Sequence, residues 1–172
     1  MLDDARILLC YDGSDQAIDA IDFAARFFPD RTRATVLYAW EPSPMAINGE
    51  WAPTAIPPES EQQARRRARS VADAGARYAR DRGLDAEALV EEAMGAPWRT
   101  IIGVADGAYD LIVMGTRGWT GVGSLLAGSI SHHVAQHAMC PVLIVPAAEH
   151  GGARRKSAQA NGHTGRDHAR CQ

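Results

Sequence analysis

The chain has 172 residues, 46% of them apolar, which is enough to bury one sizeable core but short for two independent domains. A formal charge of −3 argues against the strongly basic face that nucleic acid or an anionic membrane surface requires. No apolar run reaches the roughly 18 residues needed to span a bilayer, and Met-Leu-Asp-Asp at the start lacks the basic-then-apolar layout of a secretory signal. We therefore expect one cytoplasmic domain that binds neither nucleic acid nor membrane.

Short apolar runs alternate with longer amphipathic segments, the pattern of βαβ units around a parallel sheet. Several of the runs are continuously apolar, as expected for strands that helices cover on both faces. The predicted strands are Arg6 to Tyr11, Thr32 to Trp40, Ala86 to Glu92, Leu111 to Gly115 and Pro141 to Val145. The predicted helices are Asp15 to Phe28, about Ser60 to Asp81, a third from Pro97, and Ser129 to about Ala138. Because such crossovers are right-handed, the product is an open, doubly wound, Rossmann-like α/β sheet.

Local signals support these helices. Ile18, Ile21, Ala25 and Phe28 recur at three and four residues, which lines one helix face, and Ser14 is placed to cap that helix. Pro97 suits a first helical turn, where its missing N–H has no partner to lose. Arg65, Arg66, Arg67 and Arg69 crowd the second helix; we interpret them as a solvated face rather than a functional basic patch.

Two segments fall outside this regular pattern. Glu41 to Glu59 holds five of the nine prolines and fits either a lid or partner loop or a disordered connection. Residues 147–172 contain no large apolar side chain and carry a net charge of +3, which leaves −6 on the rest. We expect residues 1–146 to form the domain and 147–172 a disordered polar tail, an interaction arm for acidic partners being the alternative.

Candidate binding residues follow the strands at the edge where α/β sheets bind ligands. Asp12 follows the first strand and could accept hydrogen bonds from adenine or ribose. Gly115 and Gly118 follow the fourth strand, where the lack of a side chain permits positive φ and a close approach of backbone N–H groups to a ligand. Gly128 and Ser129 open the last helix, whose amino terminus favours a phosphate. Neither a G-x-G-x-x-G after the first strand nor a P-loop occurs.

The set Gly115-x-x-Gly118, nine residues, Gly128-Ser129 is identical to the ATP-binding signature G-x-x-G-x₉-G-[S/T] of universal stress proteins. Other segments also resemble that family: Ile-Leu-Leu-Cys-Tyr-Asp-Gly-Ser, Asp-Leu-Ile-Val-Met-Gly-Thr-Arg-Gly, and the last helix with the Cys-Pro-Val-Leu-Ile-Val-Pro that follows it. The resemblance spans about residues 5–146. It implies a strand order of 3-2-1-4-5 and the binding of ATP, with ADP or AMP as alternatives, together with Mg²⁺.

The resemblance also implies residue roles. Asp12 and Ala39 would hold the adenosine part, with Met114 beside them, although Ala39 and Trp40 replace the larger aliphatic or His-Val pairs common there. Ribose and phosphates would be lined by Gly115, Arg117, Gly118, Gly128, Ser129 and Ile130. The family pattern also implies a homodimer joined through the edge strand Pro141 to Val145, and an unidentified protein partner.

Other functions are weaker on the sequence. His132, His133 and His137 cluster on the last helix, but without a convincing further ligand, so we expect no metal site. Cys10 and Cys140 fit core thiols and Cys171 a tail thiol. Between Gly115 and Ser129 only Arg117 is charged, which argues against fast phosphoryl chemistry. We expect a nucleotide-dependent sensor or regulator of a stress response; a slow ATPase or adenylating enzyme and a nucleotide-free interaction protein are the alternatives.

Overall fold

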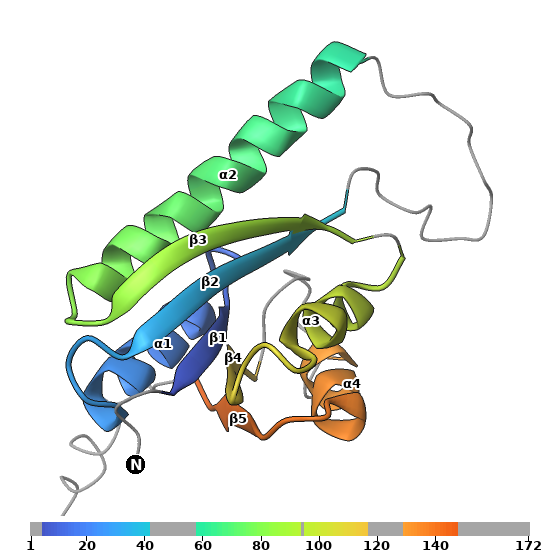
Figure 1. Ribbon diagram of the computed structural model, residues 1–172. Coiled ribbons are helices and arrows are strands. Elements are labelled where there is room, and N and C mark those ends of the chain that lie inside the picture. Colours follow the sequence, from blue (N-terminus) through green and yellow to red (C-terminus); the bar gives the residue numbers. More distant parts are fainter. Residues whose placement is uncertain (1–4, 42–57, 94, 117–128, 148–172) are drawn as a thin grey trace, which may run out of the picture.

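The computed structural model describes residues 5–41, 58–93, 95–116 and 129–147, and five parallel strands form its centre (Figure 1). They lie side by side in the order β3-β2-β1-β4-β5, which confirms the expected sheet. The strands are β1 (Arg6–Cys10), β2 (Arg33–Trp40), β3 (Asp85–Glu92), β4 (Leu111–Gly115) and β5 (Val142–Val145). Because β1 lies in the middle and the chain winds outward from it in both directions, β3 and β5 are the edges.

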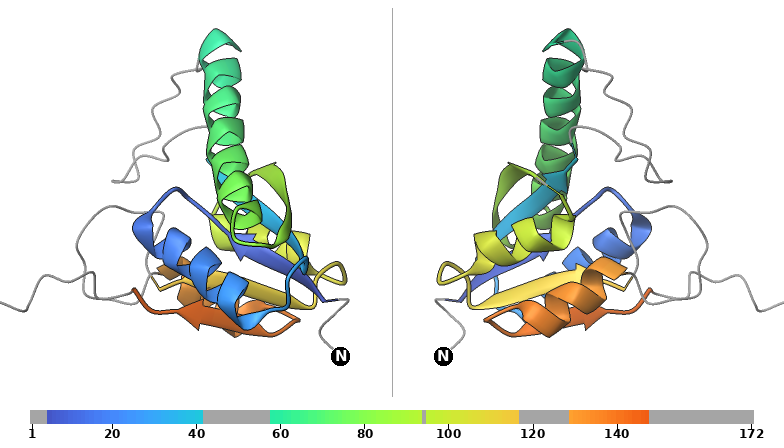
Figure 2. Two further views of the ribbon diagram at one scale, coloured as in Figure 1. Left: turned by 90° about the vertical axis from the view of Figure 1, so that its left-hand side faces the viewer. Right: turned by 90° about the vertical axis from the view of Figure 1, so that its right-hand side faces the viewer.

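Four helices connect the strands and form a layer on each face of the sheet (Figure 2). They are α1 (Asp15–Phe27), α2 (Pro58–Arg80), α3 (Pro97–Ala105) and α4 (Ser129–His137). The long helices α1 and α2 pack on one face, and the short helices α3 and α4 pack together on the other. This placement follows from right-handed crossovers on either side of β1.

Alternate residues of each strand feed two separate cores, as the pleat requires. Ile7, Leu9 and Val113 lie on the α1/α2 face, and Leu8, Ile112 and Met114 lie on the α3/α4 face. All six side chains are buried. Helices cover both faces of β1 and β4, which explains why the sequences of these two strands are continuously apolar, as proposed from the sequence.

The ends of the elements differ from the predicted ones by a residue or two. Tyr11 N–H still donates to the Leu37 carbonyl at 2.9 Å, although the strand ends at Cys10. Pro141 has no N–H to contribute, so β5 begins at Val142, while the Pro141 carbonyl accepts from Ile112 N–H at 3.0 Å. Ser14 caps α1 as expected, its hydroxyl oxygen accepting from Ala17 N–H at 3.3 Å.

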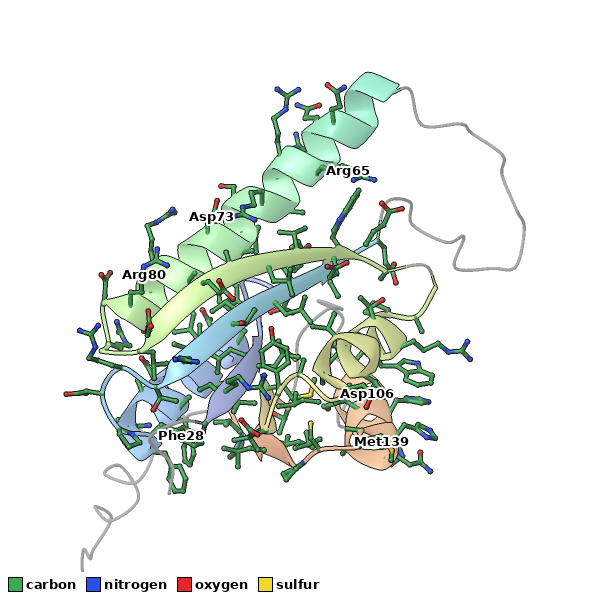
Figure 3. All side chains as sticks on the ribbon, in the orientation of Figure 1. Phe28, Arg65, Asp73, Arg80, Asp106 and Met139 are labelled. Atoms are coloured by element: carbon green, nitrogen blue, oxygen red, sulfur yellow. The ribbon has the colours of Figure 1, made fainter. Side chains whose placement is uncertain are left out.

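Helix α2 lies so close to the sheet that one position admits only glycine. A Cβ built on Gly75 would lie 2.7 Å from the Tyr11 ring and 2.9 Å from Val36. The amino-terminal part of α2 extends past the end of the sheet, where Arg65 is labelled in Figure 3. Arg65 pairs with Glu92 at 2.7 Å and Arg69 with Asp73 at 3.2 Å. These ion pairs fit the interpretation of the arginines as a solvated face.

Two predictions lie outside the described residues: the nature of the loop within residues 42–57 and that of the tail 148–172. Within the ranges that the structure describes, no helix is both long and apolar enough to cross a membrane.

Candidate functional site

The carboxyl ends of β1, β2 and β4 meet at one edge of the sheet, and the predicted adenosine residues come from these ends. Ala39 and Met114 are buried in the core beneath α3 and α4, together with Cys10 and Val134. Ile130, in the first turn of α4, packs against the same core. Three of the predicted residues therefore share one face of the sheet, although they are far apart in sequence.

Asp12 lies in the turn between β1 and α1 and is partly buried. Its Oδ1 accepts a hydrogen bond from Ser14 N–H at 3.0 Å, which fixes the carboxylate beside the amino terminus of α1. The field of this carboxylate reaches β2: the pKa of the Tyr38 phenol is raised by burial first, then by Asp12 and by Glu41. Asp12 thus presents negative charge and an acceptor oxygen at the junction of β1 and β2.

The thiol of Cys10 lies below this edge. Burial, with smaller contributions from Asp12 and Cys140, raises its pKa to about 12, so it stays a neutral thiol at any physiological pH. Cys140 is only half-buried, and burial again is the main cause that raises its pKa. The expectation of two core thiols is met fully by Cys10 and partly by Cys140; Cys171 lies outside the described residues.

Gly115 is required for a reason that the sequence did not suggest. It belongs to the end of β4, and positive φ is found instead at other glycines, Gly13 in the turn before α1 among them. A Cβ on Gly115 would lie 2.8 Å from the backbone carbonyl oxygen of Gln16. Gly115 therefore does not use the positive φ that glycine permits; the absence of a side chain instead makes room for the first turn of α1.

The beginning of α4 is held close to the end of β4 by a side chain that sequence reasoning missed. The hydroxyl of the buried Ser131 donates to the Thr116 carbonyl at 3.4 Å, and Thr116 N–H donates to the Val145 carbonyl at 3.0 Å. The sequence did contain a signal for this contact: Ser131 is the third residue of the helix, and a serine hydroxyl in a first turn can form a hydrogen bond with nearby backbone.

The remaining predicted residues are only partly covered. Ser129 is the first residue of α4, as predicted, but its side chain is outside the description, and so are Arg117, Gly118 and Gly128 entirely. Trp40 is the other departure from the family pattern. Its ring lies on the α2 side of the sheet, with the guanidinium of Arg65 5.8 Å from the ring centroid. Of the two departures, only Ala39 faces the candidate site.

Two of the three histidines of α4, His133 and His137, lie against Trp98 of α3. The rings of His133 and His137 stack on the indole with centroid distances of 5.2 and 5.3 Å. Among the residues that the structure covers, no group of three or more His, Cys, Asp or Glu side chains is placed to hold a metal ion. These rings therefore join the two short helices.

Comparison with known proteins identifies the family. The family model described as "Universal stress protein family" matches residues 5–146. The chain belongs to the universal stress protein family. A universal stress protein of Thermus aquaticus, encoded in the QAH/OAS sulfhydrylase 3′ region, is 37% identical over 145 residues, which cover 81% of this chain and 96% of the relative.

Solved universal stress proteins share the fold. One in complex with dAMP, from Archaeoglobus fulgidus, aligns with a TM-score of 0.54 at 20% identity over 84% of this chain and 98% of its own. Another, in complex with cAMP, aligns with a TM-score of 0.55 at 22% identity over 84% of this chain and 98% of its own. Both alignments span nearly the whole of those universal stress proteins.

Proposed function

We propose that the chain binds an adenine nucleotide, in the first place ATP, at the carboxyl edge of the sheet and acts as a nucleotide-dependent regulator in a stress response. The observation that carries this proposal is the convergence of Ala39, Met114 and Ile130 on one face, beside the fixed carboxylate of Asp12. The intact glycine signature and the two family structures with adenine nucleotides support it.

The base and sugar would lie where the apolar floor meets the carboxylate. Ala39 and Met114 belong to the buried apolar core beneath this position, and Asp12 offers an acceptor for an amino or hydroxyl group of the ligand. The small side chain of Ala39 leaves more room than a larger aliphatic residue would. Adenosine itself should therefore bind, more weakly than its phosphates.

The phosphates would lie at the amino terminus of α4, where helix N–H groups and the dipole favour negative charge. The stretch from Gly115 to Ser129 contains no Asp, Glu or Lys, so Mg²⁺ would be carried mainly by the phosphates themselves. With only Arg117 as a charged group there, the arrangement favours holding phosphates over cutting them.

The test is calorimetric titration with ATP, ADP, AMP and adenosine, joined to mass spectrometry of small molecules released from the freshly purified protein. Gly118→Val is the preferred site variant, since a side chain at Gly115 would also press on α1. Asp106→Asn, on the surface after α3, serves as control. Loss of ATP binding only in Gly118→Val supports the proposal; no binding by the wild type would overturn it, and several turnovers per second would favour an enzyme.

We also propose that two copies pair through the free edge of β5. Val142, Leu143 and Ile144 are only half-buried, and β5 ends the sheet. Phe27 and Met139 are the most exposed large apolar side chains of the described part, 61% and 84% accessible. Phe27 ends α1, which contacts β5, and Met139 lies in the turn between α4 and β5. Leu143→Lys should shift the sedimentation mass from dimer to monomer, whereas Arg66→Glu should leave it unchanged; a monomeric wild type would contradict the pairing.

A further inference from the structure

The amino ends of β1, β2 and β3 carry charged side chains that the proposed nucleotide site does not use. Arg6, Arg33 and Asp85 are register partners across these three strands, and register partners point to the same face of a sheet. Leu8, two residues after Arg6, belongs to the core beneath α3 and α4. The three charged side chains therefore start from the α3/α4 face, at the opposite end of the strands from Asp12.

Helix α3 is too short to cover this end of the sheet. Its nine residues span about 14 Å, whereas the eight residues of β3 span about 26 Å. In Figure 1, α3 lies toward the arrowheads of β2 and β3, where Leu37, Ala39 and Leu89 pack against its core. The first residues of β2 and β3 consequently stay uncovered on this face, and Arg33 and Asp85 are exposed.

A hollow of about 450 Å³ opens at this uncovered end. Its lining includes Arg6 from β1, Arg33 from β2, and Asp85 and Glu87 from β3. The half-buried Tyr109, in the turn between α3 and β4, adds an aromatic side chain to the wall. The volume is within the range of small-molecule sites, which combine a few placed polar groups with apolar surface.

The charges in this hollow are separated by sign. The two guanidinium groups come from β1 and β2 and the two carboxylates from β3, and neighbouring strands lie about 4.8 Å apart. Arg6 is balanced by Asp110, with Nε 3.8 Å from Oδ2. Within the described ranges, the side chains of Arg33 and Asp85 make neither an ion pair nor a hydrogen bond. A basic wall thus faces an acidic wall, and each has a group available to a ligand.

The two walls suit two different groups of one ligand. A guanidinium presents its donors as a fork that matches a carboxylate, and a carboxylate accepts from the three donors of an ammonium group. The buried Thr35 donates its hydroxyl to Glu87 Oε1 at 3.4 Å, which helps to hold the acidic wall in place. A ligand with a single charge would satisfy one wall only, whereas a zwitterion would satisfy both.

We propose that this hollow binds a small zwitterion of dipeptide size, with its carboxylate on Arg33 and its ammonium group between Asp85 and Glu87. Two extended residues span at most about 7 Å, enough to bridge one strand spacing. In a single α-amino acid one carbon atom separates the two charged groups, too short for this span. The site lies apart from the proposed nucleotide site and does not rest on the proposed function.

The experiment titrates the full chain with glycylglycine at neutral pH and low ionic strength, and follows backbone amide shifts by NMR. The amide signals of Thr35, Glu87 and Tyr109 should move together with one dissociation constant. Two capped analogues remove one charge each: N-acetyl-glycylglycine has no ammonium group, and glycylglycinamide has no carboxylate. Each should bind about tenfold more weakly than glycylglycine, because one charged hydrogen-bonded contact is lost.

Two variants assign the walls. Arg33→Gln should bind glycylglycine about tenfold more weakly and should no longer distinguish it from glycylglycinamide. Asp85→Asn should be weakened similarly and should no longer distinguish it from N-acetyl-glycylglycine. Both side chains are exposed, so the melting temperature should stay unchanged. Arg66→Gln and Asp73→Asn, on α2, make the same chemical changes away from the hollow and should bind as the wild type does.

Three results would overturn the inference: no shift with glycylglycine, capped analogues that bind as tightly as glycylglycine, or site variants that behave like the α2 controls. Gly118→Val should bind glycylglycine normally, since it alters only the proposed nucleotide site. Failure of ATP binding would therefore leave this inference standing, and failure of glycylglycine binding would leave the proposed function standing.

Discussion

The two faces of the sheet are covered in different ways. The α1/α2 face has helices of 13 and 23 residues. These helices lie so close to the sheet that neither Gly75 of α2 nor Gly115 of β4 has room for a side chain. The α3/α4 face has two helices of nine residues each, joined by the stack of Trp98 with two imidazoles. The buried predicted binding residues, Ala39 and Met114, lie on this second face.

The comparison indicates that the two faces of the sheet differ in rigidity. The first face includes polar connections between its helices: the Tyr78 hydroxyl donates to Asp22 at 3.1 Å, and Arg82 pairs with the same carboxylate. Long helices with such cross-connections resist displacement, whereas short ones depend on a few contacts. We therefore expect the α1/α2 face to act as the scaffold and the α3/α4 face to adjust to a ligand.

The largest expected effect comes from cavities made on the two faces. Ile21 and Ile101 are both buried, one beneath each pair of helices. Replacing either by alanine should lower the free energy of unfolding by about 2 to 5 kcal/mol, because the lost packing is only partly recovered by relaxation. Since α3 can relax more readily, Ile101→Ala should have the smaller effect in urea unfolding. A larger effect of Ile101→Ala would contradict the proposed division.

Two helical glycines should respond to alanine with opposite signs. In Gly75→Ala the new methyl group would overlap Tyr11 and Val36, and we expect a loss of about 1 to 3 kcal/mol despite the better helix propensity. At Gly103, in α3, a Cβ would meet nothing within 4 Å, so alanine should stabilise by up to about 1 kcal/mol. Melting temperatures measure both; stabilisation by both variants would show that α2 is not tightly packed.

Because the thiol of Cys10 is buried, we expect the folded chain to lose stability toward unfolding at alkaline pH. Its thiol has a pKa of about 12 in the folded chain against an ordinary value of 9.0, so the unfolded chain releases this proton first. Stability is therefore fully present below pH 9 and falls as pH rises from 9 toward 12, by about 1.4 kcal/mol per pH unit. Between pH 9 and 10.5 the wild type should lose about 2 kcal/mol more than Cys10→Ala in urea unfolding. Parallel losses would contradict burial of the thiol.

A smaller effect is expected at Asp12, on binding rather than on folding. Asparagine keeps the oxygen that accepts from Ser14 N–H but loses the negative charge and the second acceptor oxygen. ATP affinity in Asp12→Asn should fall about tenfold, or about 1.4 kcal/mol, with little change in melting temperature. Asp106→Asn makes the same chemical change away from the site and should bind ATP normally. Equal affinities of the two variants would remove Asp12 from the site.

The sequence predicted the sheet well because strand burial is a local property of the pattern. Continuous apolar runs marked β1, β4 and β5, and the rule that ligands bind at carboxyl ends brought Asp12, Ala39 and Met114 to one edge. The predicted ends of the strands were wrong by a residue or two where backbone hydrogen bonds determine the end. Pro141 is an example, because it has no N–H and β5 begins one residue later.

Contacts between helices that are distant in sequence could not be predicted. The need for glycine at position 115 comes from Gln16, about a hundred residues earlier, and no periodicity encodes that approach. The same holds for Trp98, whose partners lie on α4, and for Asp22, which meets residues of α2. Such contacts depend on how finished helices pack, which the one-dimensional pattern of apolar residues does not record.

The hydrogen bond from Ser131 to Thr116 has a consequence for the signature segment between them. Its two ends are already joined by the scaffold, so the chain entropy of closing this loop depends only weakly on its length, by about 0.6 kcal/mol for each doubling. Folding alone would therefore tolerate a longer or shorter segment. The spacing of nine residues between Gly118 and Gly128 is therefore expected to depend on the nucleotide that we propose this segment binds, rather than on the folding of the sheet and helices.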